Sequence, residues 1–461
     1  MHQVWCNGFE RHRHPSITAG VCGDRERARV HLYEAGLVIE RSLDRDPLAL
    51  RRSHQENLLA HAERGLAPGL ALLDLGQRKA QQSQLRECHD GKATSTSIRV
   101  PMAESIQIYI PPLDEGAMRQ AEARQARLTK PAASLGRLEA LSISLAGMTG
   151  RLDTPLANRV VFTLAADHGV ALEGVSAYPR EVTAQMVLNF LNGGAAINVL
   201  ARQMHARVVV ADLGVDADLP AHPDLRSLKV RRGTASITRG PAMSVREARQ
   251  AIGHGRLLAR EEIARSLDVA LTGDMGIGNT TASAALICAL TELDPKDVVG
   301  RGTGVDDEGL ERKRQAVRTA LTVNAELISK GPLETLAAVG GLEIAGLVGV
   351  ILEAAAGRRP VVIDGFISGA AALVAARIAP AVAGYMIAAH RSQELGHGAV
   401  LRRLGLTPLL DLDLRLGEGT GAVLALPLLE AAVRTLNEMA TFDEAGVSER
   451  SQEAAHNSPH N

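Results

Sequence analysis

The segment Leu271-Thr-Gly-Asp-Met-Gly-Ile-Gly-Asn-Thr-Thr-Ala-Ser-Ala284 decides how the rest of the chain is interpreted. An apolar run, Val269 to Thr272, enters a turn rich in glycine and leaves it in a small-residue helix that begins near Thr280. Glycines let backbone N–H groups approach an anion, and a helix start adds unpaired donors and partial positive charge. The segment predicts a strand, a phosphate-binding turn and a helix. A tight turn capped by Asn279 or Thr280, without any ligand, is equally consistent with it.

Apolar runs of the same kind recur along the chain at Val160 to Ala165, Arg207 to Asp212, Pro360 to Ile363 and Tyr385 to Ala388. Nearly continuous apolar runs are typical of parallel strands that helices cover on both faces. Alanine-rich helical stretches separate them. The pattern predicts an α/β fold with a doubly wound, mainly parallel sheet and helices on both faces. Polar groups that follow the strands should gather at the carboxyl edge, where such sheets bind ligands.

Three further helices are expected outside this alternation. Met118 to Arg127 and Leu135 to Leu145 have helical patterns, and Ser134 is a suitable cap for the second. Ala422 to Met439 is apolar with few charges, so it should be buried or lie at a subunit contact. We expect a small helical subdomain from the N- and C-terminal parts of the catalytic region.

The composition excludes several classes of function. With 51 Lys and Arg against 52 Asp and Glu, the net charge is -1, and aromatic residues make up only 2%. A nucleic-acid-binding protein would need a basic surface and stacking platforms, so no such partner is expected. The most apolar stretch, Ile367 to Ala389, contains Arg377 and Pro380, which argues against a membrane span. Without a signal-like segment, we expect the protein in the cytoplasm.

The chain divides into three parts by composition. Residues 1–104 contain Arg-rich patches and three of the four cysteines, and we expect an N-terminal extension whose order the sequence does not define. Residues 105–444 should form the catalytic domain. The polar tail 445–461 should be disordered. The four cysteines have no C-x-x-C spacing, so neither a disulfide framework nor a thiolate zinc site is expected.

A second glycine-rich loop, Gly300-Arg-Gly-Thr-Gly304, precedes Lys313. The lysine could supply a point charge to the phosphate that the first turn binds. Asp306, Asp307 and Glu308 could be interpreted as a metal cluster. Acidic residues at a helix start commonly complement the helix dipole, and that interpretation is favoured here.

The segment Val361-Val-Ile-Asp-Gly-Phe is similar to the loop with which common phosphoribosyltransferases hold a ribose diphosphate. Those loops carry two adjacent acids, whereas Gly365 follows Asp364 here. A diphosphate leaving group needs Mg²⁺ to neutralise it. The missing acid therefore argues against a diphosphate donor.

In Arg415-Leu-Gly-Glu-Gly-Thr-Gly421, one carboxylate stands between glycines at the entrance to an apolar helix. Small neighbours allow Glu418 to meet a flat ligand, and apolar walls would raise its proton affinity toward that of a general base. An exposed loop glutamate is the alternative.

Taken together, these segments resemble the nicotinate-nucleotide–dimethylbenzimidazole phosphoribosyltransferase family from about Ile106 to Phe442. The motifs fall in the family's order: Lys130-Pro-Ala-Ala-Ser-Leu-Gly-Arg-Leu-Glu, Ala166-Asp-His-Gly-Val, Glu173-Gly-Val-Ser-Ala-Tyr-Pro, Gly273-Asp-Met-Gly-Ile-Gly-Asn-Thr-Thr, Asp364-Gly-Phe and Leu416-Gly-Glu-Gly-Thr-Gly-Ala. The resemblance implies transfer of phosphoribose from nicotinate mononucleotide to 5,6-dimethylbenzimidazole, in cobalamin lower-ligand assembly. It also implies a homodimer, with neither metal nor cofactor.

The resemblance carries residue roles with it. Glu418 would accept the benzimidazole proton. The substrate-binding set would comprise Ser176 and Gln185 at the benzimidazole, Gly276, Gly278, Asn279 and Lys313 at the phosphate, Ser392 near the nicotinate carboxylate, and Asp274, Thr280 and Gly304. Asp274 stands where family members carry Glu, which leaves its proton role open. Ala132-Ala133 replaces a Pro-Gly pair.

Two rival functions are weighed against this one. Glycines 417, 419 and 421 could form the dinucleotide loop of an oxidoreductase, but the third glycine comes too early for that motif. A non-catalytic sensor would bind a nucleotide or benzimidazole and release no nicotinate. The physiological acceptor base stays open.

Overall fold

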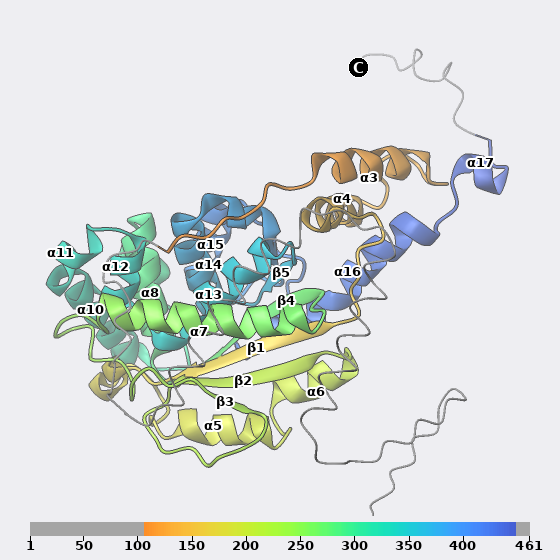
Figure 1. The fold of residues 1–461 in the computed structure, drawn as a ribbon. Helices are drawn as coiled ribbons and strands as arrows, with labels where there is room; N and C mark the ends of the chain where they lie inside the picture. The colour runs from red at the N-terminus through yellow and green to blue at the C-terminus, as the bar shows by residue number, and fades with distance from the viewer. Residues whose placement is uncertain (1–105, 449–461) are drawn as a thin grey trace, which may run out of the picture. The chain divides into compact units, whose positions relative to one another are not determined.

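Six strands form one sheet at the centre of residues 106–448, the part of the chain that the computed structural model describes (Figure 1). They are β1 (Arg159–Ala166), β2 (Arg207–Gly214), β3 (Leu225–Ser227), β4 (Val269–Met275), β5 (Val361–Ile363) and β6 (Met386–Ala388). All neighbouring strands are parallel, in the order β3-β2-β1-β4-β5-β6. The predicted parallel α/β sheet is confirmed. All five apolar runs form strands, and only the short β3 was not predicted.

The strand order reverses beside β1. From this strand the chain builds outward through β2 to β3, then returns to the other side of β1 and continues through β4, β5 and β6. Phe162 of β1 pairs with Val209 on one side and with Thr272 on the other. Open α/β sheets bind ligands at the carboxyl ends of the strands beside such a reversal. The residues that follow β1, β4 and β5 therefore share one edge.

Helices cover both faces of the sheet, as expected. One face carries α5 (Val182–Leu191), α6 (Ala196–Gln203) and α16 (Thr420–Glu438), and the other carries α13 (Leu342–Ala356) and α14 (Phe366–Ile378). Helix α7 (Val245–Ala264) packs along α13, and α8 (Asn279–Thr291) packs against α14. Figure 1 shows α5 and α6 below the strands and α7 above them.

Helix α13 is buried around nearly its whole circumference, as an apolar helix between a sheet and another helix must be. Glycines bring α7 and α13 into close contact. A Cβ at Gly255 would lie 1.8 Å from the carbonyl oxygen of Gly346, and one at Gly349 would lie 2.1 Å from that of Ile252. Larger residues at these positions would push the two helices apart.

A small helical subdomain forms beside the sheet, as expected. Helices α3 (Glu115–Arg127) and α4 (Arg137–Thr149) pack on each other and on α16. Their separate core consists of Ala117, Ala121, Ala146 and Leu436. Arg124 donates from Nε to the carbonyl oxygen of Leu436 at 2.7 Å and so ties α3 to the end of α16. Helices α3 and α4 therefore cover one side of α16.

The remaining elements are short connections, apart from α10. They are the 3-10 turns at Gly169–Glu173 and Pro380–Tyr385, α9 (Pro295–Val298), α10 (Asp307–Val323), α11 (Ala325–Ile328), α12 (Pro332–Val339), α15 (His397–Leu404) and α17 (Phe442–Ala445). Within residues 106–448, no helix is long and apolar enough to cross a membrane. The predictions for residues 1–104 and for 449–461 lie outside the described residues.

The prediction that Ser134 caps α4 was wrong. The helix begins two residues later than expected, at Arg137, and the preceding residue is Gly136 with φ of +53°. Instead, Glu139 of the first turn accepts a hydrogen bond from the backbone N–H of Leu135 at 3.0 Å and forms an ion pair with Lys130 at 2.8 Å. A glutamate reaching back replaces the serine cap.

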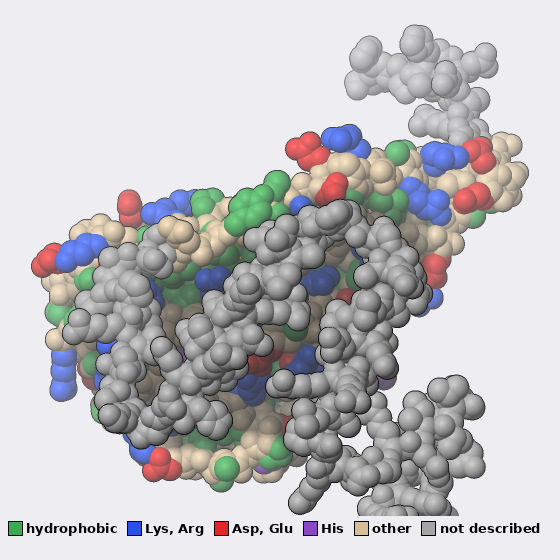
Figure 2. Space-filling model, in the orientation of Figure 1, with side chains coloured by type: hydrophobic (Ala, Val, Ile, Leu, Met, Phe, Trp, Pro, Cys, Tyr) green, Lys and Arg blue, Asp and Glu red, His purple; other side chains and the backbone are tan. Residues whose placement is uncertain are grey.

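Charged side chains of both signs are interspersed on the visible part of the described surface in Figure 2. This agrees with the nearly balanced counts of basic and acidic residues in the sequence. Many form exposed pairs, such as Arg434 with Glu438 at 2.9 Å. Such pairs contribute little to stability because water and salt screen them.

Candidate active site

Glu418 lies in a tight turn between the sheet edge and the start of α16. Its side chain is buried, and the whole residue is only 4% exposed. Oε2 accepts a hydrogen bond at 3.2 Å from the backbone N–H of Ile197, at the start of α6. Its carbonyl oxygen accepts one at 3.1 Å from the hydroxyl of Thr163 on β1. The alternative of an exposed loop glutamate is therefore wrong.

The surroundings of Glu418 increase its proton affinity. Burial raises the pKa of its carboxyl group, the Ile197 N–H partly counteracts this, and the nearby Asp364 raises the pKa further. Desolvation and a like charge both disfavour the ionised form of a carboxyl group. A carboxylate of this kind takes up a proton more readily than one in water, as a general base must.

Asp274 lies beside the Glu418 turn at the end of β4. A Cβ at Gly417 would lie 3.3 Å from its Oδ2, and the same oxygen accepts a hydrogen bond from Nδ2 of Asn279 at 2.9 Å. Burial raises the pKa of Asp274 well above its ordinary value, and Asp364, Glu343 and Glu418 add to the rise. Asp274 and Glu418 therefore belong to one buried group of acids.

Lys313 lies on α10, and its side chain reaches the start of α8 at the carboxyl edge of the sheet. Only 1% of the residue is exposed. Its Nζ donates to the hydroxyl of Thr280, in the first turn of α8, at 3.0 Å. Burial lowers the pKa of Lys313 to about 8, against the opposing effect of Glu394. A lysine so deeply desolvated gains from an anionic partner, which would offset the penalty of its buried charge.

Arg415 connects the loop of Glu418 to the loop of Lys313. Its Nη1 donates to the carbonyl oxygen of Gly302 at 2.8 Å, and a Cβ at Gly302 would lie 2.6 Å from Nζ of Lys313. Through these contacts and through chain neighbours, a closed path runs from Glu418 and Gly417 over Asp274, Asn279, Thr280, Lys313 and Gly302 to Arg415, and the backbone from Arg415 to Glu418 closes it. We call this path the ring of contacts. The ring joins the predicted base to the predicted phosphate ligands.

The turn between β4 and α8 has the predicted form. Gly278 precedes the helix with φ of +94°, and neither Asn279 nor Thr280 caps it with a side chain. A Cβ at Gly276 would lie 2.4 Å from the carbonyl oxygen of Ala166. The glycines are needed for close backbone packing, and the first N–H groups of α8 have no side-chain cap.

A buried pair that the sequence did not indicate supports this turn. Nε2 of His168, after β1, lies 2.6 Å from Oε1 of Glu343, in the first turn of α13, and both side chains are essentially inaccessible. A Cβ at Gly276 would lie 3.3 Å from that oxygen. His168 belongs to the Ala166-Asp-His-Gly-Val motif, but its partner Glu343 lies 175 residues further along the chain, so the motif by itself did not indicate the pair.

The structure brings some of the other predicted substrate-binding residues to the ring of contacts and not others. Ser176 places its hydroxyl 3.3 Å from that of Thr303, in the Lys313 loop. Ser392 is buried, and its Cβ is 3.7 Å from the position of a Cβ at Gly365. Gly304 has φ of +104° and open space on its side-chain face. Gln185 is exposed on α5, and within residues 106–448 no side-chain hydrogen bond joins it to this set.

The acidic residues before Lys313 lie at the start of α10, as the favoured interpretation of complementing the helix dipole requires. Asp306 is the N-cap of α10, and its Oδ1 accepts from the N–H of Gly309 at 2.8 Å. Asp307 and Glu308 follow in the first turn. Among the described residues, no group of three or more His, Cys, Asp or Glu side chains has the arrangement of a metal site.

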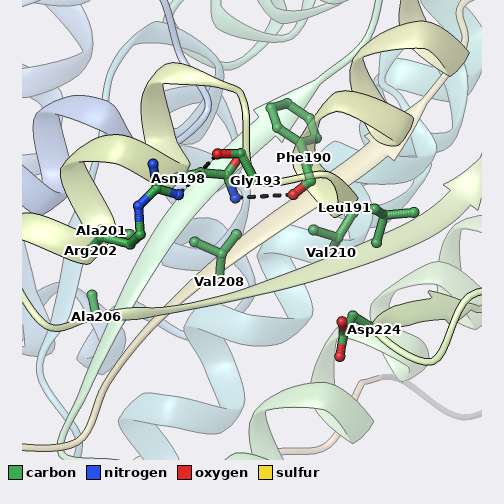
Figure 3. Close-up of a pocket in the computed structure, with 10 residues that line it drawn as sticks. All are labelled: Phe190, Leu191, Gly193, Asn198, Ala201, Arg202, Ala206, Val208, Val210 and Asp224. Carbon is green, nitrogen blue, oxygen red and sulfur yellow. Dashed lines mark hydrogen bonds between the residues drawn. The ribbon is translucent and has the colours of Figure 1, made fainter. Parts of the chain in front are cut away.

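A separate hollow of about 240 Å³ lies between α5, α6 and β2 (Figure 3). It is lined by Phe190, Leu191, Gly193, Asn198, Ala201, Arg202, Ala206, Val208, Val210 and Asp224. Its arginine already donates to the carbonyl oxygen of Gly193 at 2.9 Å. None of the predicted site residues lines it, so this hollow is separate from the ring of contacts.

Comparison with known proteins adds independent information. A family model described as phosphoribosyltransferase matches residues 110–447. The nicotinate-nucleotide–dimethylbenzimidazole phosphoribosyltransferase of Chloroflexus aurantiacus is 59% identical over 349 residues, which cover 76% of this chain and 99% of that protein. The protein of the same name from Geobacter sulfurreducens is 53% identical over 338 residues, covering 73% and 96%.

A solved structure shows the same likeness. The crystal structure of CobT from Thermus thermophilus matches with a TM-score of 0.71 and 54% sequence identity. The match covers 73% of this chain and 100% of that one.

Proposed function

Because the chain belongs to the family of nicotinate-nucleotide–dimethylbenzimidazole phosphoribosyltransferases, we propose that it transfers phosphoribose between two heteroaromatic rings. The donor is nicotinate mononucleotide and the acceptor is 5,6-dimethylbenzimidazole. The products are α-ribazole 5′-phosphate and nicotinate, in the assembly of the cobalamin lower ligand. Small molecules are therefore its substrates.

One observation carries the mechanism: Glu418 is buried, has a raised pKa and lies in the same ring of contacts as Lys313. One benzimidazole nitrogen attacks the anomeric carbon of the donor. The bond from that carbon to the pyridinium nitrogen breaks, and its electron pair neutralises the ring. The other benzimidazole nitrogen gives its proton to Glu418. General base catalysis of this kind contributes typically about 10²–10⁴-fold to a rate.

The donor phosphate has a natural place at the other side of the ring. Lys313 and Thr280 offer a cation and a hydroxyl, and the turn at Gly276 and Gly278 leads into the start of α8, which has no side-chain cap. These are the usual elements of a phosphate site. Because the leaving group is the neutral ring nitrogen of nicotinate and not a diphosphate, the proposed chemistry requires no metal ion.

The remaining assignments follow from the family resemblance. Ser176 and Gln185 would bind the benzimidazole, and Ser392 would approach the nicotinate carboxylate. Residues 105–444 would form the catalytic domain, which agrees with the range of the family match. We also propose a homodimer that works in the cytoplasm. Light scattering that gives the mass of one chain would contradict the dimer.

The test is product formation by the purified full chain. Incubation with nicotinate mononucleotide and a panel of benzimidazoles, purines and phenols is followed by mass spectrometry. We expect α-ribazole 5′-phosphate and an equal amount of nicotinate. Binding without nicotinate release would indicate a sensor instead. The same assay after removal of residues 1–104 should show retained activity, and an inactive, aggregated product would contradict the proposed domain boundary.

A further inference from the structure

Asp364 follows β5 and is one of the most deeply buried acids in the described residues, with 1% of its surface exposed. Both of its oxygens accept hydrogen bonds from the start of α16. Oδ1 accepts from the N–H of Ala422 at 2.9 Å, and Oδ2 accepts from the N–H of Gly419 at 3.3 Å. Gly419 directly follows Glu418, so Asp364 holds the peptide next to the proposed base.

The turn that Asp364 holds has an unfavourable backbone conformation. Gly417, Glu418 and Gly419 all have positive φ, at +86°, +63° and +95°. Glycine adopts this region freely, but a residue with a Cβ is disfavoured there and persists only where its surroundings impose it. Glu418 is the one member of the turn with a Cβ. Its conformation must therefore be imposed from outside.

Three strands supply that restraint. Thr163 of β1 donates to the carbonyl oxygen of Glu418, and a Cβ at Gly273 of β4 would lie 2.4 Å from the same oxygen. Asp364, after β5, binds the two N–H groups on the other side of the turn. Uncharged contacts with Thr163 and Gly273 therefore restrain the carbonyl oxygen of Glu418. The Asp364 carboxylate restrains the N–H groups that follow it in the chain.

We propose that Asp364 is the positioning residue of Glu418: by binding the first turn of α16, its carboxylate fixes the left-handed turn that aims the base. This inference rests on the proposed role of Glu418 in the reaction. Asp364 would act through the turn and would not touch the substrate, because its side chain is inaccessible and both oxygens are occupied.

The surroundings of Asp364 also explain why Gly365, and not a second acid as in the ribose-diphosphate loops, follows it. A Cβ at Gly365 would lie 3.1 Å from Nε2 of His390, so a second acid would fit only if this histidine moved by a few tenths of an ångström. His390 in turn lies 3.7 Å from Oδ1 of Asp364 and directly under Gly421, where a Cβ would approach to 2.0 Å. The space that a second acid would need holds a histidine packed against α16.

Asp364 has an electrostatic effect as well as a geometric one. The charged and titratable groups around Glu418 are Asp364 from β5, Asp274 from β4 and, behind Asp364, His390 after β6. From α6 comes the N–H of Ile197. The negative charge of Asp364 raises the pKa of Glu418. Loss of that charge should lower this pKa, so Glu418 would stay ionised at lower pH.

The test is the Asp364→Asn variant of the full chain, assayed for nicotinate release against pH. We expect kcat to fall at least about tenfold, since small misplacements of a catalytic group are costly. The KM for nicotinate mononucleotide should stay within about threefold, and the acid limb of the kcat/KM profile should move to lower pH. Asp114→Asn is the matched control, because Asp114 caps α3 in the same way, with Ala117 N–H at 2.9 Å. It should change none of these quantities.

The conservative variant Asp364→Glu keeps the charge and displaces the hydrogen bonds. We expect a reduced kcat with an unmoved acid limb, and this variant decides the matter if Asp364→Asn does not fold. An unchanged kcat in the folded variants would overturn the proposal, as would a fall in kcat of Asp364→Asn without any movement of the acid limb. Wild-type enzyme that forms no product would refute the proposed function instead, and a fully active Glu418→Gln would refute the role of the base.

Discussion

The ring of contacts has an acid side around Glu418 and a lysine side around Lys313. Both sides consist of buried ionisable groups, and the groups on the two sides have opposite charges when ionised. On the acid side, Glu418, Asp274 and Asp364 are buried near one another, and burial raises the pKa of each. On the lysine side, Lys313 is the buried cation, and burial lowers its pKa to about 8. In both places desolvation favours the neutral form. In the proposed mechanism, the same physical effect raises the proton affinity of the base on the acid side and favours an anionic partner for the cation on the lysine side.

This difference assigns separate tasks to the two sides. A base must change its protonation during the reaction, so a raised proton affinity is useful on the acid side. A phosphate ligand must hold its charge, and it does so best once the anion is bound. Variants should therefore affect turnover on the acid side and donor binding on the lysine side.

The largest effect is expected on the acid side, from Glu418→Gln. The amide preserves the shape of the side chain but cannot accept the benzimidazole proton, so kcat should fall by at least about 100-fold. The affinity for nicotinate mononucleotide, measured by calorimetry, should not change. Glu438→Gln is the control, because this exposed residue at the end of α16 pairs with Arg434 on the surface. Near-normal turnover would remove Glu418 from the mechanism.

A smaller effect is expected on the lysine side, from Lys313→Ala. A hydrogen bond to a charged group contributes roughly 1.5–3 kcal/mol, so the Kd of the phosphorylated donor should rise about tenfold or more. The Kd of free benzimidazole should stay nearly constant. Lys330→Ala, at an exposed ion pair with Glu326, is the control. Equal losses for donor and benzimidazole would show that Lys313 has a structural role.

The smallest effect is expected from pH. Lys313 is protonated below its pKa of about 8 and loses its charge as the pH rises through that value. The donor Kd should therefore increase severalfold between about pH 7 and 9. The same titration on Lys313→Ala should be nearly flat. A wild-type affinity that does not change across this range would show that the buried lysine keeps its proton, and the two sides would then differ less than inferred.

The parallel strands could be predicted because burial on both faces leaves a continuous apolar signal. Strand β3 could not, since it is three residues long and only Leu225 is buried. The cap of α4 was assigned wrongly because Glu139 reaches back to Leu135, and a serine at a plausible position was the stronger local signal. A local pattern shows which contacts a residue can make, but it does not show which of several competing partners the residue contacts in the folded chain.

The site shows the same limit. Glu418 and Lys313 were predicted from the glycine-rich loops in which they stand, whereas Asp274, Asn279 and Thr280 entered the predicted site through the family resemblance. Arg415 and Thr163 were missed as contacts, since their partners are 113 and 255 residues away in the chain. No local pattern distinguishes an arginine that bridges two loops from one in solvent.

The amino-acid sequence alone determined every strand except β3, the parallel α/β class, the family and the residue types that follow the strands at the carboxyl edge. These depend on hydrophobic periodicity and on short motifs, which are local properties of the chain. Only the tertiary structure decided which carboxylates share one buried space, what fixes Glu418 in a left-handed turn and how far Lys313 is desolvated. Burial and like-charge contact depend on neighbours that the fold brings together, and they set the pKa values on which the proposed chemistry rests.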